Sequence, residues 1–453
     1  MCANVIKNKS YENIGLCSPT ILLPNKTVDY TKWSVIAVDQ YTSDLGYWES
    51  VKTIVGNSPS TFHIVFPEIY LDTPDKDERI KNIVKTMNDY LSSNLFDEYN
   101  GFIYVERKLN NGKIRKGLVV ALDLEQYDFN KGSKTLIRAT EGTILERLPP
   151  RIAIRKDAPL ECPHIMVLID DPKGKVIDFL ETKKEDMQKL YDFELMMNGG
   201  HLQGYLVKPS LEKKIVKNLQ KLASPERFIK KYKLPSSDFP ILLYAMGDGN
   251  HSLATAKAIW EDVKDNAIDK QAIMQDPRRY ALVELVNIHD ESLDFEAIHR
   301  VLFNLNKDIV KEMKTYFGDS FRLQKNISKE QMIEKVKKDK QKTKHLIGFI
   351  NEKGFNLIKI KNPKSSLPVG TLQDFLDQFI SNKFAEKIDY VHGDDTVISL
   401  SAKQNNCGFY LPPISKKQFF KSVILDGALP RKTFSMGEAN DKRFYMECRK
   451  IKN

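Results

Sequence analysis

The sequence predicts a mixed α/β (α+β) protein, and three observations carry that prediction. Apolar segments of strand length alternate irregularly with amphipathic segments of helical spacing along the 453 residues. The turn signature Asn110-Asn111-Gly112 joins two strand-like segments, 101–109 and 113–124, into a hairpin. An apolar run, 241–246, leads through a glycine loop into an alanine-rich helical segment, 253–263.

The remaining elements follow from the same periodicities, taken in chain order. Strands are expected at 33–39, 63–71, 163–171 and 280–288, and a second hairpin at 345–361. Helices are expected at 75–96, 211–222, 294–303 and 372–384. The pair Pro149-Pro150 predicts a rigid loop, because proline cannot lie inside a helix or a central strand.

The length predicts more than one domain. We expect a catalytic core over residues 1–304, a helical and hairpin accessory region over 305–400, and a C-terminal segment over 401–453 that closes back on the core.

Composition is that of a soluble globular protein, with 41% hydrophobic and 29% charged residues. The five cysteines form no C-x-x-C pair, which argues against a structural metal and a disulfide framework. No signal peptide and no membrane-spanning run is visible, so we expect a cytoplasmic protein with no membrane partner. The net charge of +10 suits nucleic acid or a small polyanionic substrate equally well.

The segment 247–252, Gly-Asp-Gly-Asn-His-Ser, is the strongest candidate for a binding site. The first N–H groups of a helix lack partners within the helix, and the helix dipole favours negative charge there. Glycines permit a sharp turn and close approach to a ligand. The alternative is an ordinary strand–turn–helix in which Asn250 or Ser252 caps the helix.

Other polar clusters lie beside predicted strands and loops. Arginines held on a stiff loop at 138–151 suit phosphate or carboxylate recognition, unless this segment is a salt-bridged surface turn. Asp39 and Asp170 end predicted strands, where they would bind Mg²⁺, act as a base or cap a turn. A second glycine loop, 198–201, ends in a histidine, and polar clusters recur at 389–395 and 429–438.

Eight blocks of the chain, in order between about Trp33 and Arg449, resemble a family catalogued as a domain of unknown function. They read WSVIAVDQYTS, RATEGTILERLPPR, PHIMVLIDDP, NGGHLQGY, YAMGDGNHSLATAKA, RYALVELVNIHD, DYVHGDD and LPRKTFSMGEA. The resemblance implies a ParB/sulfiredoxin-like core with large additional elements. It also implies a kinase that transfers phosphate from inorganic pyrophosphate to free L-serine, giving O-phosphoserine for serine and cysteine metabolism.

With that activity in mind, the candidate residues receive roles. We expect catalysis from Asp248, Glu141 and His251, with Glu141 as a candidate general base and Asp170 and Asp39 as rivals. We expect Mg²⁺ as cofactor, held by Asp248, Asp170 and Asp39. The residues expected to bind substrate are Arg138, Arg147, Arg151, Gly249, Asn250, Ser252, His201, His392, Arg431 and Lys432.

The expected partners are L-serine and pyrophosphate, with no nucleic acid, and the expected state is a monomer or homodimer. Within the same chemistry, a phosphoserine phosphatase and an ATP- or ADP-dependent serine kinase remain open, although no P-loop is visible. A ParB-like nucleotide- or nucleic-acid-binding protein is the alternative of another class, although no helix-turn-helix or RNA module is visible.

Overall fold

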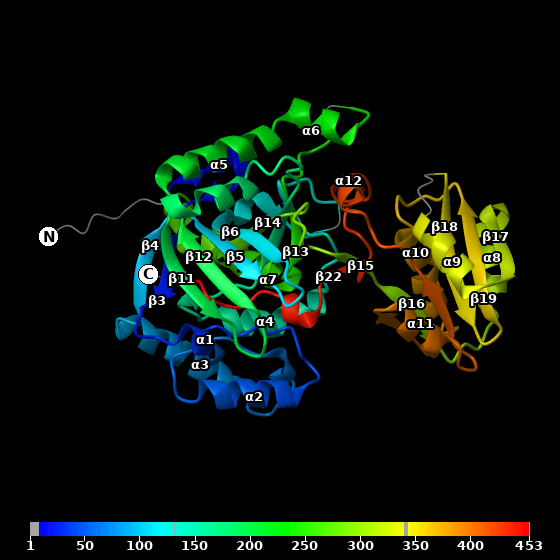
Figure 1. The fold of residues 1–453 in the computed structure, drawn as a ribbon, viewed down its shortest axis with the longest axis horizontal. Coiled ribbons are helices and arrows are strands. Elements are labelled where there is room, and N and C mark those ends of the chain that lie inside the picture. Colours follow the sequence, from blue (N-terminus) through cyan, green and yellow to red (C-terminus); the bar gives the residue numbers. More distant parts are fainter. Residues whose placement is uncertain (1–8, 131, 237, 339–342, 453) are drawn as a thin grey trace. The chain divides into compact units, whose positions relative to one another are not determined.

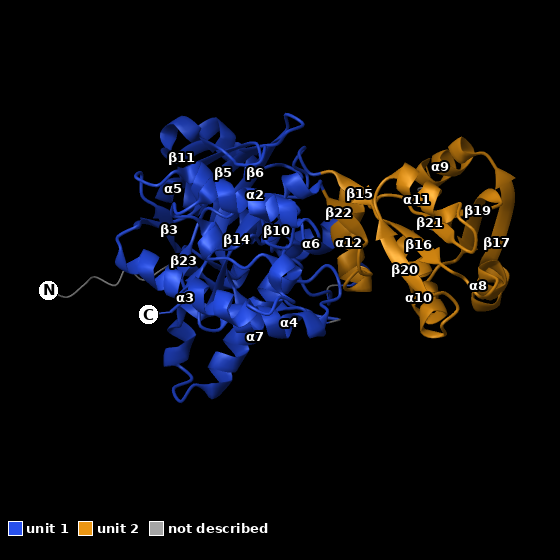
Figure 2. Cartoon of the chain, turned by 90° about the horizontal axis from the view of Figure 1, so that it is seen from below, with its two compact units in different colours: residues 1–293, 437–453 blue, residues 294–436 orange. Residues whose placement is uncertain are grey.

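The computed structural model describes residues 9–130, 132–236, 238–338 and 343–452, and it confirms a mixed α/β protein (Figure 1). The described residues fall into two compact units (Figure 2). Unit 1 comprises residues 1–293 with 437–453, and unit 2 comprises residues 294–436. Within the described residues, no helix is long and apolar enough to cross a membrane.

Unit 1 is built on one large mixed sheet. Its strands in spatial order are β11 (Gln188–Glu194), β12 (His201–Leu206), β5 (Ile103–Lys108), β6 (Ile114–Asp123), β14 (Tyr280–Asn287), β10 (Met166–Ile169), β13 (Tyr244–Asp248), β8 (Ile137–Arg138) and β7 (Tyr127–Asp128). Short strands β1 (Ser10–Tyr11) and β2 (Leu16–Cys17) extend it from β6. Two small pairs lie outside it: β3 (Thr20–Pro24) with β4 (Phe96–Asn100), and β9 (Leu160–Glu161) with β23 (Arg449–Lys450).

Both faces of this sheet are buried, each by a separate apolar core. Successive side chains of a strand point to opposite faces, so neighbouring residues enter different cores. Leu118 and Val120 of β6 belong to one apolar core, whereas Val119 belongs to another. The first core includes side chains of α5 (Pro209–Leu222) and α7 (Asn250–Asn266), and the second includes those of α2 (Leu45–Val55) and α3 (Lys76–Ser92) (Figure 1). The other helices of unit 1 are α1 (Tyr30–Trp33), α4 (Leu148–Arg155) and α6 (Pro225–Tyr232).

Unit 2 contains an antiparallel sheet flanked by helices. Its strands in spatial order are β17 (Phe321–Ile327), β19 (Gly354–Lys361), β18 (Lys344–Asn351), β21 (Cys407–Tyr410), β16 (His299–Phe303) and β20 (Lys387–Val391). Its helices are α8 (Ile309–Phe317), α9 (Lys329–Lys338), α10 (Pro368–Ser381), α11 (Asp394–Ser401) and α12 (Lys416–Asp426). A separate pair joins β15 (Phe295–Ala297) to β22 (Phe434–Met436).

Many predicted elements are confirmed, and four predictions are wrong. Both hairpins, the strand before the glycine loop, strand β14 and helices α3, α5, α7 and α10 form where the periodicity placed them. The predicted strand 33–39 instead starts at the last residue of α1, continues as a short buried segment, 34–37, with a single bridge from Ile36 to Phe444, and ends in a turn. The predicted strand 63–71 contains parts of two 3₁₀ turns, Thr61–His63 and Glu68–Tyr70.

The other two errors concern a helix and a loop. The predicted helix 294–303 forms strands β15 and β16, because its apolar residues pair with neighbouring strands of unit 2. Pro149 and Pro150 lie in the first turn of α4 rather than in a loop. Proline is tolerated there because the N–H that it lacks has no helical partner in any case.

The observed division also differs from the predicted domain boundaries of 304 and 400. Residues 294–304 lie with unit 2, since β16 pairs with β20 and β21. Residues 401–436 also lie in unit 2, and the chain returns to unit 1 at 437.

Candidate functional site

The glycine loop joins β13 directly to α7. Gly249 has φ of 76°, a left-handed conformation, and a Cβ added there would lie 3.1 Å from the Cα of Ile165. Both facts require glycine at this position. No side chain caps the start of α7 at Asn250, and the first N–H groups of a helix have no partner within the helix. This end of the helix is therefore suited to an anion.

Asp248, the last residue of β13, carries the charge beside this helix end. Its Oδ1 accepts a hydrogen bond from the Gly249 amide at 2.8 Å, and its Oδ2 lies 3.1 Å from Nζ of Lys442. Burial raises the pKa of Asp248, but the charge of Lys442 and the hydrogen bonds from Lys442 and the Gly249 amide outweigh burial, so its pKa lies below the ordinary value. The carboxylate is therefore ionised at neutral pH.

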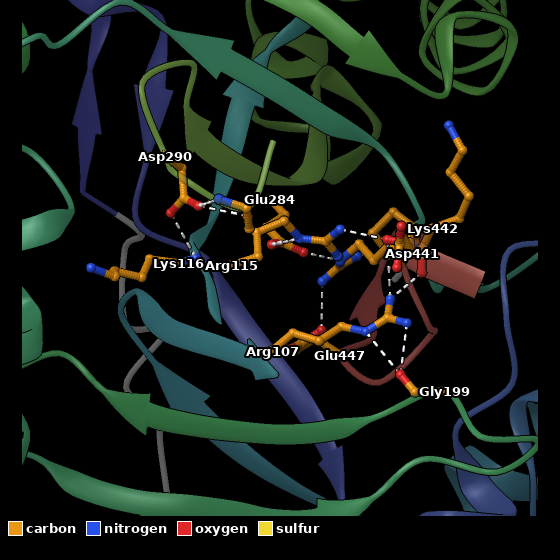
Figure 3. A network of polar contacts seen from close by, with 12 residues as sticks. Arg107, Arg115, Lys116, Gly199, Glu284, Asp290, Asp441, Lys442 and Glu447 are labelled. Atoms are coloured by element: carbon orange, nitrogen blue, oxygen red, sulfur yellow. Dashed lines mark hydrogen bonds and ion pairs between the residues drawn. The ribbon is translucent and has the colours of Figure 1, made fainter. Parts of the chain in front are cut away.

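Two buried arginines fix the segment that carries Lys442 (Figure 3). Arg107 of β5 donates to the main-chain carbonyls of Asn440 and Lys442, and Arg115 of β6 donates to the carbonyl of Asp441 at 2.6 Å. These two side chains lie inside the unit, at only 2% and 3% relative exposure. Three consecutive carbonyls are thus held by guanidinium groups, which positions the ammonium of Lys442 at Asp248.

The buried charges of this arginine cluster are compensated. Glu284 of β14 accepts a hydrogen bond from Nε of Arg443 at 2.7 Å, and its other oxygen lies 3.7 Å from Nε of Arg115. Arg443 also pairs with Glu447 at 2.6 Å. A buried guanidinium is tolerated only when charges and carbonyls surround it, as they do here.

His164 forms the second part of the site. Its Nε2 lies 3.4 Å from Oγ of Ser252 and 3.7 Å from Oδ2 of Asp39, and its Nδ1 lies 2.8 Å from the hydroxyl of Tyr445. That hydroxyl accepts a hydrogen bond from the Val38 amide, which leaves its own proton for Nδ1. The arrangement favours a proton on Nε2, toward Ser252 and Asp39.

A cavity of about 140 Å³ opens beside His164 and Ser252, between α4 and α7. Its polar lining includes Arg151, which pairs with Glu68 and donates to the carbonyl of Arg147 at 2.7 Å. Its apolar lining includes Ile64, Val65, Phe66, Leu71, Ile154 and Ile165. The cavity is therefore mainly apolar, with polar groups at the α7 end and the α4 side.

Several predicted residues meet here. Asp248, Gly249, Asn250, His251 and Ser252 form the loop and first helical turn, Asp39 approaches Ser252 through His164, and Arg151 lines the cavity. The segment with Glu141 runs beside β13, because β8 pairs with β13 in parallel and Oγ1 of Thr140 donates to the carbonyl of Met246 at 2.8 Å.

Other predicted residues of unit 1 lie elsewhere. Arg138 donates to the carbonyls of Thr135, Pro240 and Ile241, at the end of β13 opposite to Asp248. Burial lowers its pKa to about 10. His201 lies 2.9 Å from the carboxylate of Asp192 across the β11–β12 hairpin, and Arg147 is exposed.

Asp170 belongs to a different polar cluster. It accepts hydrogen bonds from the Tyr232 hydroxyl at 2.6 Å and from His289 at 2.7 Å, and it pairs with Lys231 at 2.9 Å. Strands β10 and β13 are antiparallel with Met166 opposite Asp248, so Asp170 lies four residues away, about 13 Å along the strand. The structure does not bring Asp170 to Asp248.

The predicted residues His392, Arg431 and Lys432 lie in unit 2. Arg431 donates to the Tyr390 hydroxyl at 2.6 Å and pairs with Asp377 at 3.0 Å, and the carbonyl of Lys432 accepts a hydrogen bond from Arg300. Their role in binding the substrate of unit 1 stays a prediction.

The residues predicted from the sequence do not include His164, Lys442, Arg107, Arg115 or Tyr445. His164 is the second residue of the predicted strand 163–171, where it reads as part of a buried strand and gives no sign of a site. Arg107 and Arg115 face each other across the predicted hairpin, a register that strand alternation alone would have shown. Lys442 and Tyr445 lie far along the chain, and no local pattern connects them to the loop.

The loop also offers oxygen donors for a divalent cation. Oδ1 of Asn250 is buried and has no hydrogen-bond partner among the described residues, and the Asp248 carboxylate stands two residues before it. Carboxylate and amide oxygens suit Mg²⁺, which also binds substrate phosphates. Asp170 does not fit, because it lies about 13 Å along the strand from Asp248 and cannot share a cation with it. Among the described residues, no group of three or more His, Cys, Asp or Glu side chains converges on a metal position.

Comparison with known proteins gives one family match. A family model described as "Protein of unknown function (DUF1015)" matches residues 22–379. No curated protein matches the chain.

Several solved structures show a weak likeness. A free serine kinase in complex with AMP has 9% identity and a TM-score of 0.38, covering 74% of this chain and 92% of that chain. A conserved hypothetical protein from Pyrococcus furiosus has 11% identity and a TM-score of 0.36, covering 74% and 95%. SbnI with a C-terminal truncation, from Staphylococcus aureus, has 10% identity and a TM-score of 0.34, covering 70% and 82%. Similarity at this level does not establish a shared activity.

Proposed function

This chain belongs to the DUF1015 family, and we propose that it is a phosphotransferase that moves a phosphoryl group from inorganic pyrophosphate to free L-serine, giving O-phospho-L-serine. The observation that carries the proposal is the uncapped start of α7 after Gly249, with Asp248 and Lys442 on one side and His164 and Ser252 on the other. It joins an anion site to groups able to handle a hydroxyl proton.

The start of α7 is proposed to hold the phosphates. Its N–H groups and the ammonium of Lys442 supply positive charge, and the hydroxyl of Ser252 supplies one more hydrogen bond. The buried clamp of Arg107 and Arg115 keeps Lys442 in place without movement of the chain. Phosphoryl transfer depends mainly on such positioning and charge neutralisation.

The serine hydroxyl is proposed to lie between Asp248 and His164. Asp248 is ionised and would orient the hydroxyl, as a carboxylate does in other phosphoryl-transfer sites. His164, held by Tyr445 at Nδ1, presents Nε2 toward Ser252. Glu141 remains a candidate base, since its segment runs beside β13. Bound Mg²⁺, held by Asp248 and Asn250, would neutralise charge on the phosphates.

The size of the neighbouring cavity favours a small donor and acceptor. Its volume of about 140 Å³ is below the roughly 300–1,000 Å³ of pockets that enclose drug-sized ligands. Serine and pyrophosphate need no base or ribose pocket, and the polar end of the cavity, at His164 and Ser252, is the part that would meet them.

The proposal is tested by a donor panel. Purified protein is incubated with L-serine and Mg²⁺, and separately with pyrophosphate, ATP, ADP or no donor, and phosphoserine is measured by mass spectrometry. We expect phosphoserine with pyrophosphate only. Phosphoserine formed only with ATP or ADP would show that a nucleotide, and not pyrophosphate, is the phosphoryl donor. Release of phosphate from added phosphoserine, without any synthesis of phosphoserine, would show that the protein is a phosphatase. No product from any donor, with tight and salt-dependent DNA binding, would favour the ParB-like alternative.

A further inference from the structure

A second hollow in unit 1, of about 440 Å³, lies beyond the C-terminal end of β10. The loop that follows Asp171, the end of α5 and the helix α6 surround it (α5 and α6 in Figure 1). Its apolar lining comes from Pro172, Val176 and Leu222. The volume lies within the range of pockets that hold small organic ligands.

The charged lining of this hollow is almost entirely positive. Its cations come from three separate segments and are Lys173, Lys175, Lys221, Arg227 and Lys231. Asp171 is the carboxylate in the lining, and its two oxygens accept hydrogen bonds from the amides of Lys173 at 3.3 Å and Val176 at 2.7 Å. The carboxylate therefore shapes the loop and is not directed at the surrounding cations.

Four of these five cations are exposed and pair with no carboxylate among the described residues, whereas some lysines of unit 1 are neutralised by a glutamate. Lys116, Lys184 and Lys264 each pair with a glutamate within 2.8 Å. In the described parts of the chain, no carboxylate pairs with the side chains of Lys173, Lys175, Lys221 or Arg227. Like charges around one hollow repel one another, and a bound anion would remove that repulsion.

The hollow is also built on fixed backbone. Asp171 holds the loop at two amides, and the side-chain amide of Asn218 in α5 donates to the carbonyl of Lys175 at 2.7 Å. Lys231 is anchored at 2.9 Å to the carboxylate of Asp170. Cations on a surface that is merely solvated need no such bracing, because each side chain is free to extend into water.

We propose that this hollow binds a small organic polyphosphate, of the class of a nucleoside diphosphate, at a site separate from the Asp248 loop. The phosphates would meet the cations of the rim, and the organic part would cover the apolar lining. The inference does not depend on the proposed kinase activity. The register of β10 with β13 places Asp171 about 16 Å along the strand from Asp248, so the two sites are distinct.

The test is calorimetric titration of the full-length protein with ADP, AMP, adenosine and inorganic pyrophosphate. We expect ADP to bind more tightly than AMP, adenosine not to bind, and the affinity for ADP to fall as salt is raised. The triple variant Lys173→Gln, Lys221→Gln, Arg227→Gln should lose about 30-fold in ADP affinity, roughly threefold for each exposed charge.

Two controls make the result specific. The triple variant Lys213→Gln, Lys217→Gln, Lys230→Gln removes the same charge from α5 and α6 outside the lining and should bind ADP as the wild type does. Asp248→Asn should also leave ADP binding unchanged. Equal weakening by the two triple variants, or loss of ADP binding in Asp248→Asn, would overturn the proposal. A pyrophosphate affinity equal to that of ADP, and weakened to the same extent by the lining variant but not by the control variant, would refute the organic part of the ligand.

Discussion

The two ends of the β10–β13 pair each carry an aspartate, and they differ in how many hydrogen-bond donors and acceptors have partners within the protein. At one end, Asp170 receives Tyr232, His289 and Lys231 within 2.9 Å. At the other end, Asp248 receives Lys442 and the Gly249 amide. There, a buried oxygen of Asn250 has no hydrogen-bond partner among the described residues, and the helix start is uncapped.

This difference separates a structural cluster from a site. A carboxylate surrounded by three side-chain donors stabilises the fold and leaves little capacity for a ligand. A carboxylate beside open donors and acceptors is arranged for a group that the chain itself does not supply. Because both ends carry an aspartate, residue type does not distinguish them. What distinguishes them is the polar groups that have no partner in the part of the chain that the structure describes.

Removing Arg107 should have the largest effect on stability, because Arg107 holds the segment that places Lys442 beside Asp248. Arg107→Met leaves the carbonyls of Gly199, Asn440 and Lys442 buried without a donor. We expect a loss of about 4 kcal/mol in the free energy of unfolding, measured by urea denaturation. Arg79→Met, on the surface of α3, should keep the midpoint of the wild type. A wild-type midpoint in Arg107→Met would show that these carbonyls find other partners.

Asp170→Asn tests the cluster formed by Asp170 with Tyr232, His289 and Lys231. It keeps the shape of the side chain but removes the charge that compensates Lys231, and we expect a loss of about 3 kcal/mol in unfolding free energy. Phosphoserine formation per folded molecule should stay near that of the wild type. A variant with wild-type stability that had lost activity would show that Asp170 acts in the reaction and does not stabilise the fold.

The same variant should change the dependence of stability on acid. Burial raises the pKa of Asp170, but the hydrogen bond from His289 and the charge of Lys231 outweigh burial, so its folded pKa lies below the ordinary value. The unfolded chain therefore takes up the proton first, at about pH 3.9. The stabilising contribution is complete above that pH and is lost as the pH falls through the folded pKa.

We therefore expect the stability difference between wild type and Asp170→Asn to shrink as the pH is lowered from 5 toward 2. Urea denaturation at each pH measures it. A difference that stayed constant over this range would show that the pKa of Asp170 is the same in the folded and unfolded chain.

Ser252→Ala should have the smallest effect. Its hydroxyl lies 3.4 Å from Nε2 of His164, a long hydrogen bond at a partly exposed site. We expect unfolding free energy within about 0.5 kcal/mol of the wild type and a roughly tenfold loss in kcat/KM, the size expected for one lost hydrogen bond to a charged substrate. Unchanged kcat/KM would place the phosphates away from the first turn of α7.

The open end could be predicted because its signal is local. Strand, glycine loop and helix follow one another in the chain, so β13, Gly249 and α7 were found from spacing alone. The hairpin β5–β6 was found in the same way from its turn. Asp170 was predicted as a metal ligand because the sequence shows a carboxylate at a strand end but not the three donors that fill it.

The remainder depends on contacts between distant segments. His164, Lys442 and Tyr445 come together through tertiary packing over about 280 positions of sequence, as the hydrogen bond between His164 and Tyr445 shows. The apolar segment 33–39 resembles a strand, yet only its middle residues, 34–37, lie in a buried segment, which pairs through a single bridge from Ile36 to Phe444. Apolar periodicity reports that a segment is buried, and it does not report which partner buries it.

The most direct test compares Asp248→Asn with Asp265→Asn, a matched change at the exposed far end of α7. Phosphoserine formed from pyrophosphate and L-serine is measured for both variants and the wild type, with unfolding midpoints as the check on folding. We expect a loss on the order of 10³-fold for Asp248→Asn and wild-type activity for Asp265→Asn. A folded Asp248→Asn protein with wild-type activity would contradict it.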